Sequence, residues 1–136
     1  MASEGPDEAA PPPAEIEPAE LADRLRETGP AGVPAVALVD CREPFEHAIC
    51  RIEGAALVPM DETPARLDDL RALLDRAAEH AAEHDQPPEL VVYCHHGVRS
   101  LRVAHFLRGK GFQTARSLAG GIDRWSEQID PTVPKY

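Results

Sequence analysis

The sequence predicts an α/β fold in which a mainly parallel sheet is covered by helices on both faces. Two short apolar runs without polar interruption, residues 36–39 and 90–93, are typical of strands that are buried on both faces. Between them, residues 64–83 repeat leucine and alanine at helical spacing with charged residues on the other positions. Strands that alternate with helices favour parallel pairing, because each crossover helix packs back onto the sheet.

The remaining elements follow from local signals along the chain. Pro18 suits the first turn of a helix, because the amide hydrogen that it lacks has no partner there, and Gly29-Pro30 ends that helix. After the long helix, Pro87-Pro88 marks a break. The other expected elements are a helical turn at 43–49, a strand at 55–58, a helix after residue 100 that ends at Gly109 or Gly111, a strand at 114–118 and a closing helix from 122 to about 129.

The first 14 residues differ in composition from the rest. They are mostly proline, alanine and acidic residues, with no aromatic and no branched aliphatic side chain. Such a segment cannot bury enough apolar surface to offset the entropy of ordering. The sequence therefore predicts a disordered acidic tail at residues 1–14 and one folded domain at residues 15–136.

The charge of the chain excludes some classes of partner. The formal net charge is −10, and the first 20 residues carry six acidic residues and no basic one. Binding of nucleic acid or of an anionic membrane needs clusters of basic residues, so neither is expected. No signal peptide or membrane span is recognisable, and three cysteines, an odd number, favour free thiols in a reducing, cytoplasmic setting.

Cys94 is the candidate nucleophile, because it follows the expected strand at 90–93 directly and opens a turn into a helix. In an open parallel sheet, sites lie beyond the carboxyl ends of the strands. The backbone N–H groups after Cys94, the positive end of the next helix, two histidines and Arg99 would all favour the thiolate, the form that attacks. Gly97 allows the tight turn. These residues alone indicate a cysteine nucleophile in an anion-binding loop and leave its reaction open.

Four segments resemble the rhodanese-like sulfurtransferase family. They are residues 94–100 (CHHGVRS), 38–44 (LVDCREP) followed by Glu46, 51–55 (RIEGA) and 118–125 (LAGGIDRW). The resemblance covers roughly residues 16–136 and implies a doubly wound, mainly parallel five-stranded sheet. The last seven residues, DPTVPKY, are also similar to rhodanese domains fused to enzymes that activate sulfur-carrier proteins.

The resemblance implies a sulfurtransferase that works by double displacement. Cys94 would take sulfane sulfur from a small donor such as thiosulfate or a persulfide, and pass it to a sulfur-carrier protein or a small thiol. Residues His95, His96, Gly97, Val98, Arg99 and Ser100 would form the binding loop, with Arg99 on the anionic donor. Asp40 and Arg42 would support that loop or form an ordinary ion pair. No metal or other cofactor is expected.

Two other functions remain open. Phosphatases and arsenate reductases of this fold carry five residues between the cysteine and the arginine of the loop, whereas only four separate Cys94 from Arg99. A non-enzymatic module that senses sulfane sulfur or binds a partner is the second alternative. Cys41 and Cys50 match no role in the family, and each is a spare thiol unless one of them is a resolving cysteine near Cys94.

Overall fold

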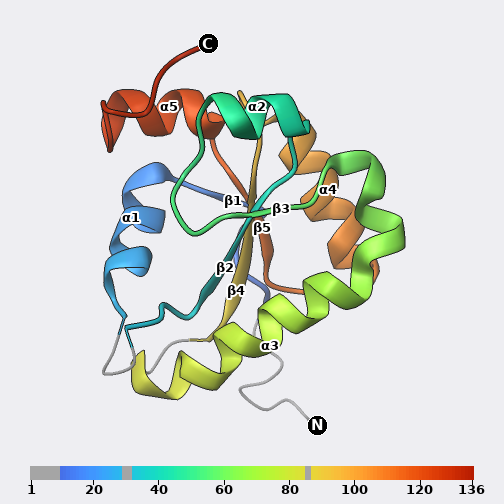
Figure 1. Ribbon diagram of the computed structural model, residues 1–136. Coiled ribbons are helices and arrows are strands. Elements are labelled where there is room, and N and C mark those ends of the chain that lie inside the picture. The colour runs from blue at the N-terminus through green and yellow to red at the C-terminus, as the bar shows by residue number, and fades with distance from the viewer. Residues whose placement is uncertain (1–9, 29–31, 85–86) are drawn as a thin grey trace, which may run out of the picture.

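A computed structural model describes residues 10–28, 32–84 and 87–136 of the chain (Figure 1). These residues form a five-stranded sheet with the order β1-β5-β4-β2-β3, and every pairing is parallel. The strands are β1 (Glu15–Ile16), β2 (Val36–Asp40), β3 (Ala56–Leu57), β4 (Glu89–Tyr93) and β5 (Ala115–Leu118). The predicted α/β class and the doubly wound parallel sheet are confirmed.

Helices cover both faces of the sheet. α1 (Pro18–Arg26) and α5 (Gly121–Gln128) pack on one face, and α3 (Leu67–His84) and α4 (Val98–Gly109) pack on the other (Figure 1). The short α2 (Pro44–Ile49) follows β2, and a 3-10 helix, η2 (Met60–Arg66), leads into α3. The helix expected to start at residue 64 therefore begins within a continuous helical segment that Met60 opens.

The central strands divide their side chains between two cores. Along β2, Val36 and Leu38 face α1 and α5, whereas Val39 faces α3 and α4. The in-register partners on β4 alternate in the same way, with Val91 in the first core and Val92 in the second. Burial on both faces explains why these strands are apolar at nearly every position.

The strand β1 was not apparent in the sequence, because two residues at a sheet edge carry no periodic pattern. It pairs Glu15 with Ser117 and Ile16 with Leu118. Just before it, the carbonyl oxygens of Pro12 and Pro13 accept hydrogen bonds from arginine side chains of the domain. The boundary at residues 14 and 15 stays a prediction, and residues 1–9 of the expected tail lie outside the described residues.

One end of the sheet positions the candidate site. β2 and β4 end side by side at Asp40 and Tyr93, so the residues that follow both strands emerge at the same edge. Figure 1 shows α2, α5 and the C-terminus at this end of the molecule. In the ranges that the structure describes, no helix combines the length and apolar character that crossing a bilayer requires.

Candidate active site

The loop from Cys94 to Ser100, which we call the Cys94 loop, wraps around one sulfur atom. The backbone N–H groups of Gly97 and Ser100 donate hydrogen bonds to Cys94 Sγ at 3.1 and 3.3 Å. Ser100 Oγ lies 3.3 Å from the same sulfur and is itself 2.7 Å from Ser117 Oγ on β5. Ser100 belongs to the first turn of α4, so the positive end of this helix faces Cys94 as predicted.

A further donor comes from the neighbouring strand. The Cys41 thiol interacts with Cys94 Sγ, and this interaction contributes most to lowering the pKa of Cys94 to about 5. Burial opposes the shift, since only 1% of Cys94 is exposed, but the donors of Cys41, Ser100 and Gly97 together outweigh it. The pKa of Cys41 is raised in turn, first by its hydrogen bond to Cys94 and then by burial. The donors around Cys94 Sγ therefore favour the thiolate form of this side chain.

The start of α5 holds the Cys94 loop in place through backbone hydrogen bonds. The N–H groups of Ile122 and Asp123 donate to the carbonyl oxygens of Cys94 and His95 at 2.9 and 3.1 Å. Gly121 has a φ of +64°, and a Cβ at this position would collide with the His95 carbonyl. Gly121, the first residue of α5, has no role assigned from the sequence, but its lack of a side chain allows the helix backbone to approach the loop closely.

Arg99 is tied to α2 rather than left free for a ligand. Its Nη1 and Nη2 donate to Glu46 Oε1 and Oε2 at 2.8 and 3.0 Å. This pair lowers the pKa of Glu46 to about 2, with hydrogen bonds from Arg99 as the largest cause. Glu46 also caps α2 by accepting the backbone N–H of Glu43. The side chain of Arg99 is still one third exposed, so the guanidinium remains within reach of solvent.

Asp40 and Arg42 form a fully buried ion pair next to this contact. Arg42 Nε and Nη2 donate to the two oxygens of Asp40 at 2.9 and 2.7 Å, and His47 Nδ1 lies 2.8 Å from Asp40 Oδ2. Arg42 Nη1 also donates to the hydroxyl of Tyr136 at 2.8 Å, and that hydroxyl donates to Glu46 Oε2 at 2.7 Å. The pair expected to support the loop is therefore connected to it through Tyr136 and Glu46.

The two histidines form a stack at the surface. The rings of His95 and His96 lie 3.9 Å apart at an angle of 24°, and the ring of Tyr136 lies 4.0 Å from His95 on the other side. Burial, together with the neighbouring His96, lowers the pKa of His95. At neutral pH His95 is then uncharged, so it does not supply the positive charge that the sequence suggested.

Ligand atoms of His95, His96 and Asp123 lie close enough together to be considered as a metal site. The two imidazole rings are stacked, so the lone pairs of their nitrogens lie in nearly parallel planes and do not converge on one ion. The geometry of this cluster does not fit a metal centre.

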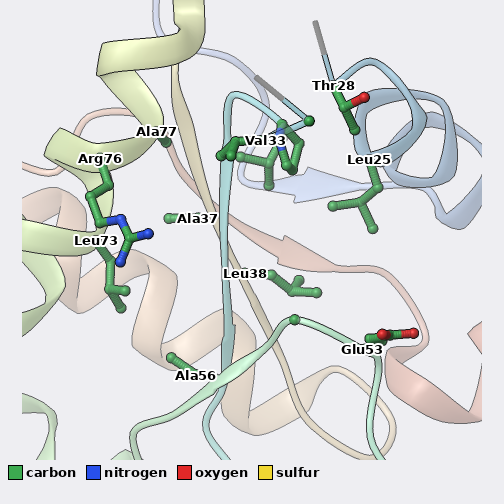
Figure 2. Close-up of a pocket in the computed structure, with 14 residues that line it drawn as sticks. Leu25, Thr28, Val33, Ala37, Leu38, Glu53, Ala56, Leu73, Arg76 and Ala77 are labelled. Carbon is green, nitrogen blue, oxygen red and sulfur yellow. The ribbon is translucent and has the colours of Figure 1, made fainter. Parts of the chain in front are cut away.

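A separate cavity lies away from the Cys94 loop (Figure 2). It has a volume of about 660 Å³ and is lined by the start of β2, the segment around Glu53 and one side of α3, including Leu38, Leu73 and Ala77. None of its lining residues belongs to the Cys94 loop. The candidate active site is the loop and not this cavity.

Four residues of this site were missed or undervalued in the sequence. Glu46 and Gly121 stood within recognised segments without a role, Tyr136 stood in the C-terminal segment, and Cys41 was left open. The sequence signal for Cys41 is that it follows a buried strand directly, as Cys94 does. Of the predicted loop residues, Gly97 and Ser100 contact Cys94 Sγ, whereas His95 and His96 stack on each other and Arg99 pairs with Glu46. Val98 is 66% exposed.

The structure is that of a doubly wound α/β domain in which a loop at the carboxyl edge of the parallel sheet surrounds a buried cysteine sulfur. The chain belongs to the rhodanese-like domain family, whose model matches residues 17–128.

Curated relatives carry this domain within larger proteins. The adenylyltransferase and sulfurtransferase MOCS3-2 of Zea mays is 33% identical over 99 residues, which are 73% of this chain and 19% of that protein. The probable adenylyltransferase/sulfurtransferase MoeZ of Mycobacterium tuberculosis is 34% identical over 101 residues, which are 74% of this chain and 23% of that protein. The chain thus spans about a fifth of the length of these relatives.

Solved structures of single domains match over nearly their full length. A rhodanese-related protein from Thermoplasma volcanium has a TM-score of 0.65 and 26% identity, with coverage of 91% of this chain and 100% of that one. The human single-domain sulfurtransferase TSTD1 has a TM-score of 0.64 and 26% identity, with coverage of 86% and 98%. The family predicted from the four segments is confirmed, and its relatives include sulfurtransferases.

Proposed function

We propose that the protein is a sulfurtransferase that carries sulfane sulfur as a persulfide on Cys94. The observation that carries the proposal is the environment of Cys94 Sγ. This atom receives hydrogen bonds from two backbone amides, a serine hydroxyl contacts it, and the Cys41 thiol lowers its pKa. These donors favour a sulfur anion, and the same amides are available to a terminal sulfur added to Cys94.

The first half-reaction is attack of the Cys94 thiolate on the outer sulfur of thiosulfate or of another persulfide. With thiosulfate, a bond forms between Cys94 Sγ and the sulfane sulfur, the sulfur–sulfur bond of the donor breaks, and sulfite leaves with the electron pair. Sulfite needs no proton to leave, so the site requires no general acid for this step. Arg99, one third exposed and interacting electrostatically with Cys94, is a cation that the incoming anion can reach.

In the second half-reaction a thiophilic acceptor attacks the terminal sulfur and regenerates the thiolate. We propose a protein acceptor, such as a sulfur carrier, ahead of a small thiol. Among the described residues, the large hydrophobic side chains that are more than a third exposed come from α2, the Cys94 loop and the C-terminus: Phe45, Ile49, Val98 and Tyr136. An apolar rim around a nucleophile suits contact with another protein.

The test is intact-protein mass spectrometry after incubation with thiosulfate and then with cyanide. We expect the protein to gain the mass of one sulfur atom, to lose it to cyanide as thiocyanate, and to gain nothing when Cys94 is replaced by serine. A protein that takes no sulfur from thiosulfate or from a small persulfide would reject the proposal. Hydrolysis of an aryl phosphate in the same preparation would then support the phosphatase alternative.

A further inference from the structure

Cys41 and Cys94 occupy matching positions on adjacent parallel strands. The register pairs Asp40 of β2 with Tyr93 of β4, and the Cys41 N–H donates to the Tyr93 carbonyl at 3.0 Å. Each cysteine is therefore the next residue after a paired position. Adjacent strands lie about 4.8 Å apart, which falls within the range of Cα separations that a disulfide spans, about 4.4–6.8 Å.

Both side chains also point to the same face of the sheet. Cys41 and Cys94 belong to the core between the sheet and helices α3 and α4, and each is 1% exposed. Their thiols are close enough for each to shift the pKa of the other. Cys50 is also buried, with 7% exposed, but lies in the core on the opposite face, so the chain provides its own control cysteine.

We propose that Cys41 is a resolving cysteine that discharges the Cys94 persulfide as hydrosulfide. This inference rests on the proposed function, because it needs the persulfide to form. The Cys41 sulfur attacks Cys94 Sγ, a bond forms between these two atoms, and the bond from Sγ to the terminal sulfur breaks. The terminal sulfur leaves as hydrosulfide with the bonding electrons and the Cys41 proton.

The electrons balance within this step. The sulfane sulfur gains two electrons and becomes sulfide, and the two cysteine sulfurs lose two electrons and become a disulfide. No external oxidant takes part. A small thiol or a dithiol reductant then restores the free cysteines by thiol–disulfide exchange.

Loading with sulfur prepares this attack. In the resting protein both sulfurs are fully reduced, so they form no bond without an oxidant, and the neighbouring thiolate holds Cys41 as a thiol. When Cys94 accepts sulfur, the negative charge moves to the terminal atom, and Sγ becomes an electrophile beside the Cys41 sulfur. An external acceptor, which attacks the terminal sulfur, then competes with Cys41, which attacks Sγ, for the same persulfide. Without an acceptor the protein releases sulfide.

The experiment loads the protein with thiosulfate, removes the donor, and follows released sulfide and intact mass without any acceptor or reductant. We expect one equivalent of sulfide, a final mass two hydrogens below that of the reduced protein, and a Cys41–Cys94 link in peptide mapping. Cys41→Ser and Cys41→Ala should still gain sulfur on Cys94, at a rate that is measured separately because Cys41 also acts on the thiolate. Once loaded, both should release sulfide at least about tenfold more slowly. Cys50→Ala should behave as the unchanged protein does.

The outcomes separate the two proposals. A persulfide that forms on Cys94 but decays equally fast with and without Cys41 overturns the resolving role and leaves the sulfurtransferase intact. Failure of every variant to gain sulfur rejects the proposed function, and the resolving role with it. Oxidation of the unloaded protein by diamide tests the pairing separately: a Cys41–Cys94 disulfide supports it, and a disulfide that includes Cys50 contradicts it. Melting curves of the variants confirm that they fold.

Discussion

Arg99 and Glu46 join the Cys94 loop to α2 through two hydrogen bonds, from Nη1 to Oε1 at 2.8 Å and from Nη2 to Oε2 at 3.0 Å. A two-point contact of this kind fixes the plane of the guanidinium as well as its position. It also balances the charge of Arg99, so the thiolate is stabilised mainly by hydrogen-bond donors and not by a free cation. The geometry of the loop, more than its net charge, therefore prepares Cys94 for reaction.

Replacing Glu46 by glutamine should weaken folding and sulfur loading together. The change removes a charge-assisted contact, so we expect the free energy of unfolding to fall by about 1.5–3 kcal/mol. Thiosulfate loading should slow, because Arg99 loses the partner that orients it. Urea unfolding and the rate of sulfur gain by mass spectrometry measure the two effects. Glu62→Gln, at an exposed pair with Arg66, should change the free energy by less than about 0.5 kcal/mol.

The same pair predicts a loss of stability in acid. The pKa of Glu46 is lowered in the folded protein to about 2 from a usual value of 4.5. Its contribution to stability is therefore present above pH 4.5 and disappears as the pH falls towards 2. We expect the difference in unfolding free energy between the unchanged protein and Glu46→Gln to shrink over this interval. A difference that is constant from pH 5 to pH 2 would contradict the assignment.

A low pKa at Cys94 should be visible directly. The thiolate absorbs in the ultraviolet, and the difference between the unchanged protein and Cys94→Ser should titrate with a midpoint near pH 5. Cys41→Ala removes the largest stabilising hydrogen bond, so the midpoint should move to higher pH. Cys41→Ser keeps a hydroxyl donor and should move it less. Equal midpoints in all three proteins would show that Cys41 does not act on the thiolate.

Much of the fold could be predicted because burial on both faces leaves a clear pattern. Residues 36–39 and 90–93 are apolar without interruption, and both lie within central strands of the sheet. Cys94 could be singled out because polar residues and a glycine follow such a strand immediately. Strand β1 gave no such pattern: Glu15 and Ile16 form a strand only because β5 offers an edge beside them.

The contacts that hold the site together could not be predicted, because they join residues that lie far apart in the sequence. The hydroxyl of Tyr136 bridges Arg42 and Glu46, residues that lie 94 and 90 positions earlier in the chain. The contact between Cys41 and Cys94 depends on strand register, which local sequence does not determine. Pairings of this kind exist only once the chain has folded, so no spacing in the sequence indicates them.

Gly121 should be far less tolerant of alanine than another glycine with a similar backbone. Both Gly121 and Gly54 have positive φ, so alanine at either position costs about 1–2 kcal/mol from backbone strain. At Gly54 a Cβ meets nothing within 4 Å, whereas at Gly121 it would collide with the His95 carbonyl. We expect Gly121→Ala to exceed Gly54→Ala in destabilisation, and only Gly121→Ala to slow sulfur loading. Urea unfolding and mass spectrometry of both variants check this, and equal behaviour would contradict the close contact between α5 and the loop.

Tyr136 should act on the site in two separable ways. Its hydroxyl bridges Arg42 and Glu46, and its ring stacks on His95. Tyr136→Phe removes only the bridge, so we expect a loss of about 0.5–1.5 kcal/mol in unfolding free energy and slower sulfur loading.

Tyr136→Ala removes the stack as well, and His95 then loses a ring that covers it. We therefore expect the pKa of His95, measured by NMR titration, to rise towards its usual value in Tyr136→Ala but to change little in Tyr136→Phe, because burial is the main cause of its lowering. An unchanged pKa of His95 in both variants would show that the ring of Tyr136 does not affect His95, and that Tyr136 acts on the site only through its hydroxyl.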